Sequence, residues 1–215
     1  MNSIPSHVTL VEHPLVRVKL TRLRDERTTS AEFRALAQEL AALLAFAATR
    51  DLATVTERIR TPLTDCDGAK LGRPVVIVPI LRAGLAMLDG ILPFLSDATV
   101  GHIGMRRDEK THLPHCYYFN VPANLAEADV IVVDPMLATG QSVSESITQL
   151  KAAGAKRIRF ICFLSTPAGL ACLAAKHPDV PVFTAAIDFG LDHRAFIMPG
   201  LGDAGDRYFG TPPAA

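Results

Sequence analysis

The stretch Val130-Ile-Val-Val-Asp-Pro-Met-Leu-Ala-Thr-Gly-Gln-Ser142 decides the fold of this chain. Its four leading β-branched residues predict a strand buried on both faces, which is typical of a parallel sheet covered by helices. Asp134 closes the strand, and small and hydroxyl-bearing residues then lead into a helix expected over residues 142–153, with Gly154 as its C-cap. Ligands of open α/β folds bind where the strands end, so Asp134 is predicted to lie at a ligand-binding edge.

The same loop offers the chemistry of a phosphate site. The amides of residues 139–142 open a helix, where free N–H groups and the helix dipole attract anions. Asp134 would suit sugar hydroxyls or a metal rather than that phosphate, because like charges repel. A Walker loop is excluded, since the pattern GxxxxGK[ST] is absent. The spacing alone is also compatible with an ordinary N-cap loop after a core strand.

Outward from this stretch, patterns typical of buried strands and of helices alternate, which indicates a parallel sheet with covered faces. Further strands are expected at residues 75–78, 99–105, 157–164 and 182–188, and further helices at residues 84–95 and 169–177. The chain shows no repeat, low-complexity tract or linker. We therefore expect a single α/β domain over residues 1–215, with a mostly parallel sheet flanked by helices and short appendages at both ends.

The segment before residue 74 has a different character. Thr29 and Glu32 stand at the spacing of a capping box, and apolar residues then recur at helical spacing to about Thr49. Residues 54–60 alternate weakly and predict an edge strand. Residues 61–73 contain Pro, Gly and Asp and predict a loop or a hairpin.

Arginines follow two of the predicted strands. In Pro79-Ile-Leu-Arg-Ala-Gly84, Arg82 and Gly84 would put a cation and accessible amides at the same sheet edge as Asp134. A lone arginine in a turn is more often simply solvated. However, Arg106 and Arg107 close another strand in the same way, and three loops with complementary phosphate chemistry are difficult to attribute to packing alone.

The segment Pro199-Gly-Leu-Gly-Asp-Ala-Gly-Asp206 contains a literal GxGxxG. A dinucleotide fingerprint is rejected, because that motif needs a preceding strand, a following helix and an acid about 20 residues further on. The preferred interpretation is a tight loop whose backbone approaches a flat ligand, with Asp203 beside it. A flexible C-terminal turn is the alternative.

Composition excludes several classes of protein. The 22 basic and 22 acidic residues balance, which argues against a protein that coats nucleic acid or an anionic membrane. We find no membrane-spanning run and no secretory signal, and the four cysteines lack framework spacing, so a cytoplasmic protein with free thiols is expected. His112, His115 and Cys116 lack a second ligand cluster, so no metal site is predicted there.

These loops together resemble the uracil phosphoribosyltransferase family, which belongs to the type I phosphoribosyltransferases. The strings Asp134-Pro-Met-Leu-Ala-Thr-Gly140 and Pro199-Gly-Leu-Gly-Asp-Ala-Gly-Asp-Arg207 are long and specific, and His13-Pro-Leu-Val16 and Phe209-Gly-Thr211 extend the match. The resemblance implies a glycosyltransferase that moves ribose 5-phosphate from 5-phosphoribosyl 1-diphosphate (PRPP) to N1 of uracil, giving UMP and diphosphate. It also implies that the N- and C-terminal appendages form a hood over the base.

The resemblance further implies roles for individual residues. Asp203 and Arg107 would be catalytic. PRPP would contact Arg82, Arg107, Asp134, Pro135, Met136, Leu137, Ala138, Thr139, Gly140, Gln141, Ser142 and Asp203, and uracil would contact Ile197, Gly202, Asp203 and Ala204. Magnesium would be carried mainly by PRPP rather than by protein ligands. Members of the family often form dimers or larger assemblies, and some are activated by GTP.

Three departures from the family pattern stand out. Gln141 replaces a glycine, which would be strained if the position required a positive φ and tolerated if only its N–H is used. Arg106 replaces an aromatic residue, and residues 108–116, which would form a flap over PRPP, diverge. A phosphoribosyltransferase for another base and a PRPP- or nucleotide-sensing regulator on the same fold remain alternatives. RNA binding is disfavoured by the absence of a basic stripe.

Overall fold

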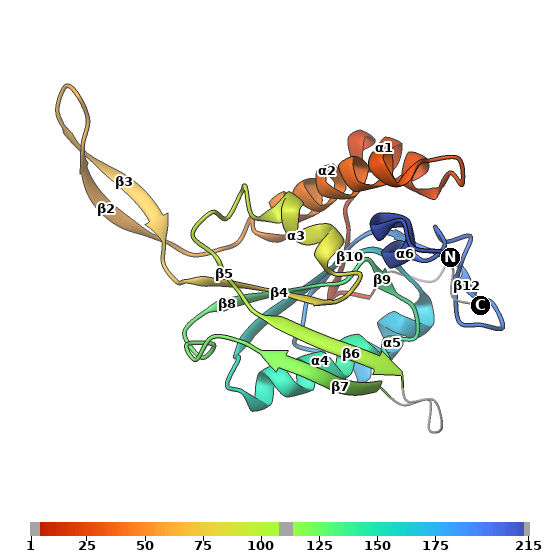
Figure 1. Ribbon diagram of the computed structural model, residues 1–215. Coiled ribbons are helices and arrows are strands. Elements are labelled where there is room, and N and C mark those ends of the chain that lie inside the picture. Colours follow the sequence, from red (N-terminus) through yellow and green to blue (C-terminus); the bar gives the residue numbers. More distant parts are fainter. Residues whose placement is uncertain (1–4, 108–113, 213–215) are drawn as a thin grey trace.

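The computed structural model describes residues 5–107 and 114–212, and within them nine strands form one twisted sheet (Figure 1). Along the sheet the order is β1-β11-β10-β8-β4-β6-β7, with β5 beside β4 and β9 beside β10. Their bounds are β1 Val8–Leu10, β4 Val75–Leu81, β5 Thr99–Val100, β6 His102–Arg107, β7 Pro114–Asn120, β8 Asp129–Val133, β9 Met136–Leu137, β10 Arg157–Ser165 and β11 Val182–Ile187. All pairings are parallel except β6 with β7. The predicted mostly parallel sheet is confirmed.

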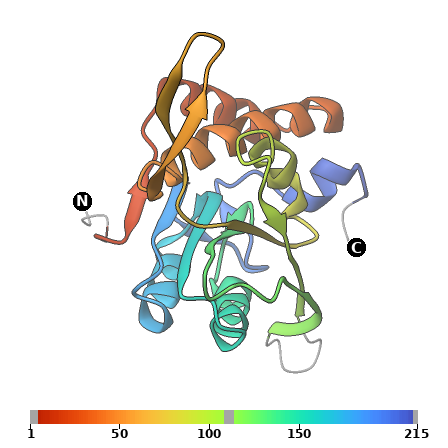
Figure 2. The same ribbon diagram turned by 90° about the vertical axis from the view of Figure 1, so that its left-hand side faces the viewer.

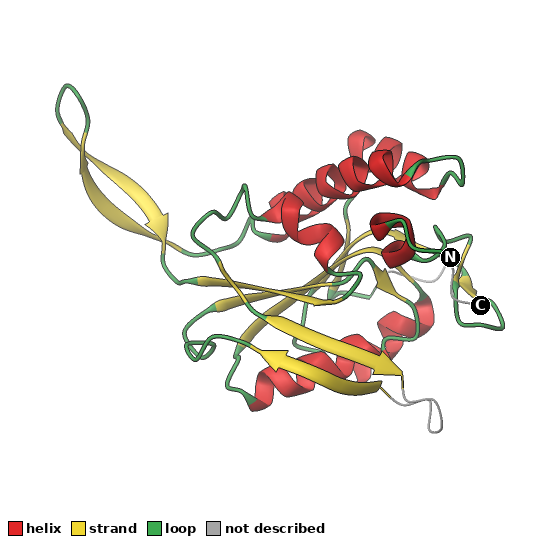
Figure 3. Cartoon of the chain, viewed as in Figure 1, coloured by secondary structure: helices red, strands yellow, loops and turns green. Residues whose placement is uncertain are grey.

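Helices cover both faces of this sheet (Figures 2 and 3). The helices are α1 Pro14–Arg24, α2 Ser30–Ala48, α3 Leu85–Ile91, α4 Gln141–Ala152, α5 Pro167–Lys176 and α6 Ala204–Phe209. One apolar core contains residues of α1, α2, α3 and α6 and one face of the strands, and a second contains residues of α4 and α5 and the other face. Burial on both faces explains why β4 and β8 are nearly continuous apolar runs.

Helix α2, the longest element of the N-terminal half, forms where the sequence predicts a helix. Thr29 caps α2, accepting from Glu32 N, while the Glu32 side chain accepts from Thr29 N, so the predicted capping box is confirmed. The buried apolar residues of α2 recur at helical spacing and include Phe33, Leu36 and Leu40. This amphipathic stripe holds α2 against the sheet.

The strand predicted over residues 54–60 and the hairpin predicted after it are confirmed, because β2 (Thr54–Arg60) pairs with β3 (Asp65–Leu71). This hairpin is a sheet of its own rather than an edge of the main sheet, and it projects away from the body of the protein (Figure 1). Two other predicted bounds are wrong. The expected strand 99–105 is split at Gly101 into β5 and β6. Helix α3 is shorter than expected. The apolar pattern of the sequence locates only the residues that pack into the core. The β2–β3 hairpin is mostly exposed, so no such pattern shows where it pairs.

The two chain ends contribute more than short appendages. Strand β1 adds to the sheet beside β11, and α1 packs on the face covered by α2. Near the other end, β12 (Gly190–Leu191) and β13 (Ile197–Met198) form a small antiparallel pair that leads into α6. Helices α1 and α6 and strand β12 lie toward one end of the molecule, opposite the β2–β3 hairpin (Figure 1).

Gly90 allows α2 and α3 to pack closely. A Cβ atom at Gly90 would lie 2.1 Å from Gln38 O. Alanine favours an isolated helix by about 1 kcal/mol over glycine, but here it would force the two helices apart. We expect Gly90→Ala to lower the free energy of unfolding by about 1–3 kcal/mol.

Thermal unfolding checks this expectation, with Gly190→Ala as the control, because a Cβ at Gly190 would meet no atom within 4 Å. The melting temperature of Gly90→Ala should fall by about 2–4 °C for each kcal/mol. An unchanged melting temperature would show that the close approach of α2 and α3 is not a constraint.

Candidate active site

Three loops meet beyond the carboxyl ends of β4 and β8. These strands are paired in parallel, with Pro79 opposite Val133. At Gly84, in the turn after β4, a Cβ would lie 2.6 Å from Val133 O, so this turn rests on the end of β8. At Gly205, in the first turn of α6 after the C-terminal loop, a Cβ would lie 3.8 Å from the Ala83 Cβ. The structure thus brings together the three segments that the sequence singled out.

The loop between β8 and α4 forms an open helix N-terminus. Gly140 is the N-cap residue with φ of 79°, and within the described residues no side chain caps this helix. Ser144 N donates to Gly140 O at 2.9 Å in the first turn of α4. Gln141 and Ser142, the first two residues of the helix, are exposed. This arrangement suits an anion such as phosphate.

Gln141 is tolerated at its position. It is the first residue of α4, and the single non-glycine residue with positive φ in the described chain is Ala195. The glycine-to-glutamine departure therefore introduces no backbone strain, and the residue can still offer its N–H.

Thr166 and the first turn of α5 pack against the β8–α4 loop, a contact that the sequence analysis did not predict. Thr166 caps α5 and donates through Oγ1 to Ala138 O at 2.7 Å, and its N–H donates to Leu137 O at 3.1 Å. At Gly169 a Cβ would lie 2.5 Å from Leu137 O. The available signal was Thr166-Pro167, a good N-cap and first-turn pair.

Part of the predicted PRPP loop is scaffold. Met136 and Leu137 form β9, which pairs with β10, and the side chain of Leu137 is fully buried. Pro135 has no N–H, and its carbonyl accepts from Phe163 N at 2.9 Å and Leu164 N at 3.0 Å. These residues shape the loop, which leaves Ala138 to Ser142 as the part that faces the ligand edge.

Asp134 is partly buried where β8 ends. Its Oδ1 accepts from Met136 N at 3.4 Å. Burial, with a smaller contribution from the negative charge of Asp203, raises the pKa of the Asp134 carboxyl to about 7. The hydrogen bond from Met136 N opposes this shift. The Asp134 carboxyl is therefore easily protonated near neutral pH.

The C-terminal loop forms a second wall. Gly200 and Gly202 have φ of 63° and 77°, and Asp203 caps α6, its Oδ1 accepting from Asp206 N at 2.9 Å. A cavity of about 920 Å³ is lined by Ile197, Gly202 and Asp203, with further walls from the α1–α2 turn. Ala204, the fourth residue predicted to contact uracil, is buried at the start of α6.

Arg82 reaches toward the C-terminal loop. Its guanidinium forms an ion pair with Asp206 Oδ1 at 3.3 Å and lies over the Phe209 ring, 5.9 Å from the centroid. The side chain is 60% exposed, so it remains accessible to an anionic ligand. Asp206 is a partner that the sequence patterns did not identify.

The other predicted cations lie at the limit of what the structure describes. Arg106 and Arg107 end β6, and Arg106 is exposed, whereas the Arg107 side chain lies outside the described part. Of the predicted flap, residues 108–113 lie outside the described residues, and 114–116 begin β7. His112 is likewise not described.

No group of three or more His, Cys, Asp or Glu side chains in residues 5–107 and 114–212 is arranged to hold a metal. Asp134 and Asp203 could each offer an oxygen, which fits a magnesium ion that arrives with a phosphate-bearing ligand and keeps most of its ligands from that molecule and water. Across the described chain, no helix is long and apolar enough to span a membrane.

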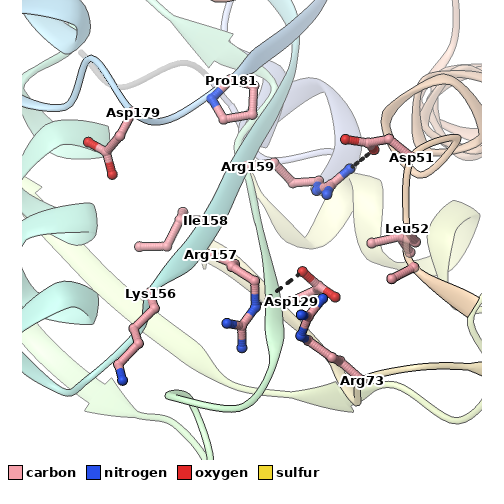
Figure 4. A pocket seen from close by; sticks show the side chains of 11 residues that line it. Asp51, Leu52, Arg73, Asp129, Lys156, Arg157, Ile158, Arg159, Asp179 and Pro181 are labelled. Carbon is pink, nitrogen blue, oxygen red and sulfur yellow. Dashed lines mark hydrogen bonds and ion pairs between the residues drawn. The ribbon is translucent and has the colours of Figure 1, made fainter.

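A smaller hollow of about 350 Å³ lies at the opposite edge of the sheet, where β8 and β10 begin (Figure 4). Its charges are largely matched: Arg159 pairs with Asp51 at 2.6 Å and Arg157 with Asp129 at 3.6 Å. The amino ends of parallel strands are not where open α/β folds bind ligands. We therefore assign the active site to the carboxyl edge.

The sheet and the loops at its carboxyl edge define a protein of the phosphoribosyltransferase fold class. A solved hypoxanthine-guanine phosphoribosyltransferase from Bacillus anthracis shares this fold, with a TM-score of 0.52 and 16% identity over 74% of this chain and 80% of that one. A solved protein from Aquifex aeolicus is more similar, with a TM-score of 0.91 and 30% identity over 96% of this chain and 100% of that one.

The family follows from sequence comparison. The model of the family described as "Uracil phosphoribosyltransferase" matches residues 10–211. A uracil phosphoribosyltransferase from Paracoccus denitrificans is 50% identical over 96% of this chain and 98% of its own length, and one from Salinibacter ruber is 49% identical over 95% and 98%. The chain belongs to the uracil phosphoribosyltransferase family, as the resemblance of its motifs had indicated.

The raised pKa of Asp134 predicts a pH-dependent stability. Because its folded-state pKa of about 7 exceeds the ordinary value of 3.8, folding favours the protonated acid. The stabilisation is complete below about pH 4 and is lost as the pH rises through about 7. We expect the permanently neutral Asp134→Asn to melt several degrees above the wild type at pH 8, with the difference shrinking toward pH 5.

Melting curves between pH 5 and pH 8 measure this, with the exposed Asp97→Asn as the matched control. Asp97→Asn should follow the wild type at every pH. A constant offset for Asp134→Asn across the range would mean that the Asp134 carboxyl titrates normally.

Proposed function

We propose that this chain is a pentosyltransferase that moves the 5-phosphoribosyl group of PRPP to N1 of uracil, releasing diphosphate and forming UMP. One observation carries the proposal: the turn after β4 approaches both the end of β8, which leads into a helix N-terminus suited to phosphate, and the segment at Gly205, next to Asp203 in the wall of the C-terminal cavity. The family membership reported above supports the choice of base and donor.

The PRPP half of the site is proposed from the β8–α4 loop. The amides of Thr139, Gly140, Gln141 and Ser142 would bind the 5-phosphate, with Ala138 alongside and Pro135, Met136 and Leu137 as scaffold. Asp134 would accept hydrogen bonds from the ribose hydroxyls. Its acidity would be restored when the ligand's hydroxyl donors satisfy the carboxylate.

The departure of diphosphate determines which charges the active site must stabilise. Displacement at C1′ builds positive charge on the ribose and negative charge on the leaving group, so positioned cations lower the barrier without a covalent nucleophile. We assign this role to Arg82 and Arg107. When bound on PRPP, magnesium would supply further neutralisation of the diphosphate oxygens.

The uracil half is proposed from the C-terminal loop. Uracil carries alternating acceptors and a donor on one edge, which backbone N–H and C=O groups near Ile197, Gly202 and Ala204 can match. Exchanging one donor, as cytosine does, would leave a buried group unpaired and weaken binding. Asp203 belongs to the same loop and is the N-cap of α6, and we place it beside the reacting C1′.

The assay of UMP formation tests the reaction directly. Purified protein is incubated with PRPP and uracil, with and without magnesium, beside cytosine, orotate and hypoxanthine. We expect turnover with uracil that depends on magnesium. Turnover with another base alone would support the alternative of a sister transferase, and PRPP binding without turnover of any base would favour a sensor.

Asp203→Asn separates catalysis from stability. Asparagine caps helices as well as aspartate does, so the free energy of unfolding should change by less than about 1 kcal/mol. Loss of the negative charge at the reaction centre should lower kcat by about 100-fold. Asp67→Asn on the exposed hairpin is the control, and near-normal turnover of Asp203→Asn would remove this residue from the site.

Assembly and regulation are proposed on the family resemblance alone. We propose that two or more copies associate and that GTP raises the activity. Size-exclusion chromatography with light scattering measures the mass in solution, and the UMP assay with added GTP measures activation. A monomer, or a rate unaffected by GTP, would reject the respective proposal.

A further inference from the structure

A buried ion pair holds the C-terminal loop at one glycine. Arg24 is the last residue of α1, and Asp188 follows β11 directly. Arg24 Nη1 and Nη2 donate to Asp188 Oδ2 and Oδ1 at 2.7 Å and 2.6 Å. The side chains of Asp188 and Arg24 are 5% and 23% exposed. This two-pronged geometry is the strongest form of a guanidinium–carboxylate contact.

The Arg24–Asp188 ion pair forms hydrogen bonds with both backbone polar groups of Gly200. Asp188 Oδ2 accepts from Gly200 N at 2.9 Å, and Arg24 Nη1 donates to Gly200 O at 2.8 Å. The four contacts form a closed ring in which the carboxylate faces the N–H and the guanidinium faces the carbonyl. The orientation of the peptide groups on both sides of Gly200 is therefore fixed.

Position 200 requires glycine in this conformation of the loop. Its φ is 63°, and a Cβ at this position would lie 2.0 Å from Ile197 O. Gly202 and Asp203 follow two and three residues later and line the cavity proposed for uracil. Because Gly202 and Asp203 follow so closely along the chain, a change in the peptide orientation at Gly200 would displace the groups that would contact the base.

We propose that Arg24 and Asp188 are positioning residues that set the shape of the base-binding loop and so determine the affinity for uracil. Neither touches the substrate. The inference rests on the proposed function, and it goes beyond it by assigning base affinity to a pair located behind the loop, one member of which belongs to the N-terminal helix.

Two conservative variants test this proposal. Asp188→Asn keeps the volume but has one acceptor oxygen in place of two, so its NH2 group would face either the Arg24 nitrogen that now donates to Oδ1 or the donors that share Oδ2. Arg24→Lys keeps the charge but loses the planar fork. Loss of a charge-assisted hydrogen bond at Gly200 would let the base-binding loop leave its bound shape, so we expect the KM for uracil to rise about 10- to 100-fold in Asp188→Asn and less in Arg24→Lys. The KM for PRPP should change by at least several-fold less than the KM for uracil, because the β8–α4 loop that would hold the 5-phosphate is untouched.

Arg22→Gln is the matched control. Arg22 lies in the same last turn of α1 but forms only an exposed pair with Glu32 at 3.9 Å. Its steady-state constants should equal those of the wild type. Melting curves accompany every variant, and if Asp188→Asn does not fold, the milder Arg24→Lys provides the result.

The outcomes separate this inference from the reaction itself. A wild type that forms no UMP contradicts the proposed function before any variant is made. Given an active wild type, a rise in the KM for uracil alone supports the positioning role. Unchanged constants, or a lower melting temperature with equal loss of kcat at unchanged KM for uracil, would show a purely structural pair and overturn the inference.

Discussion

Parallel pairing of β8 with β4 on one side and β10 on the other is the constraint on which the site depends. Asp129–Val133 is buried along its whole length and in register with both neighbours. Parallel strands end at the same edge, so the turns that follow them must meet there. The close contact of the Gly84 turn with Val133 O and the pairing of β9 with β10 then hold two of these turns in place.

The electrostatics of this edge favour ligand binding over stability. Asp134 is buried near a second acid, Asp203, and its pKa is raised as a result. At neutral pH the folded protein therefore holds a carboxyl that would be fully ionised in the unfolded chain. Arg82 meanwhile pairs with Asp206 rather than with either of these acids. An incoming ligand that brings hydroxyl donors and phosphate groups would satisfy both the acid and the arginine.

Much of this arrangement could be predicted from local sequence, because it depends on short-range patterns. Buried strands followed by Asp134 and Arg82 placed both residues at one edge, and the capping box at Thr29 located α2. The strand over residues 54–60 and a hairpin after it could be predicted, but an exposed arm carries no burial pattern that shows whether it joins the main sheet. Arg24 and Asp188 are 164 positions apart, and no local signal connects them. Thr166 offered an N-cap signal, but its contact with Ala138 O depends on the tertiary packing of α5 against the loop.

The central claim is that three loops form one site at the carboxyl edge of the sheet. Hydrogen exchange of the protein with and without PRPP and uracil tests it most directly. The account predicts that the Gly84 turn, the Asp134–Ser142 loop and the Gly200–Asp203 loop become protected together when both ligands are present. Protection confined to the hollow at the opposite edge, around Arg157 and Arg159, would contradict the account.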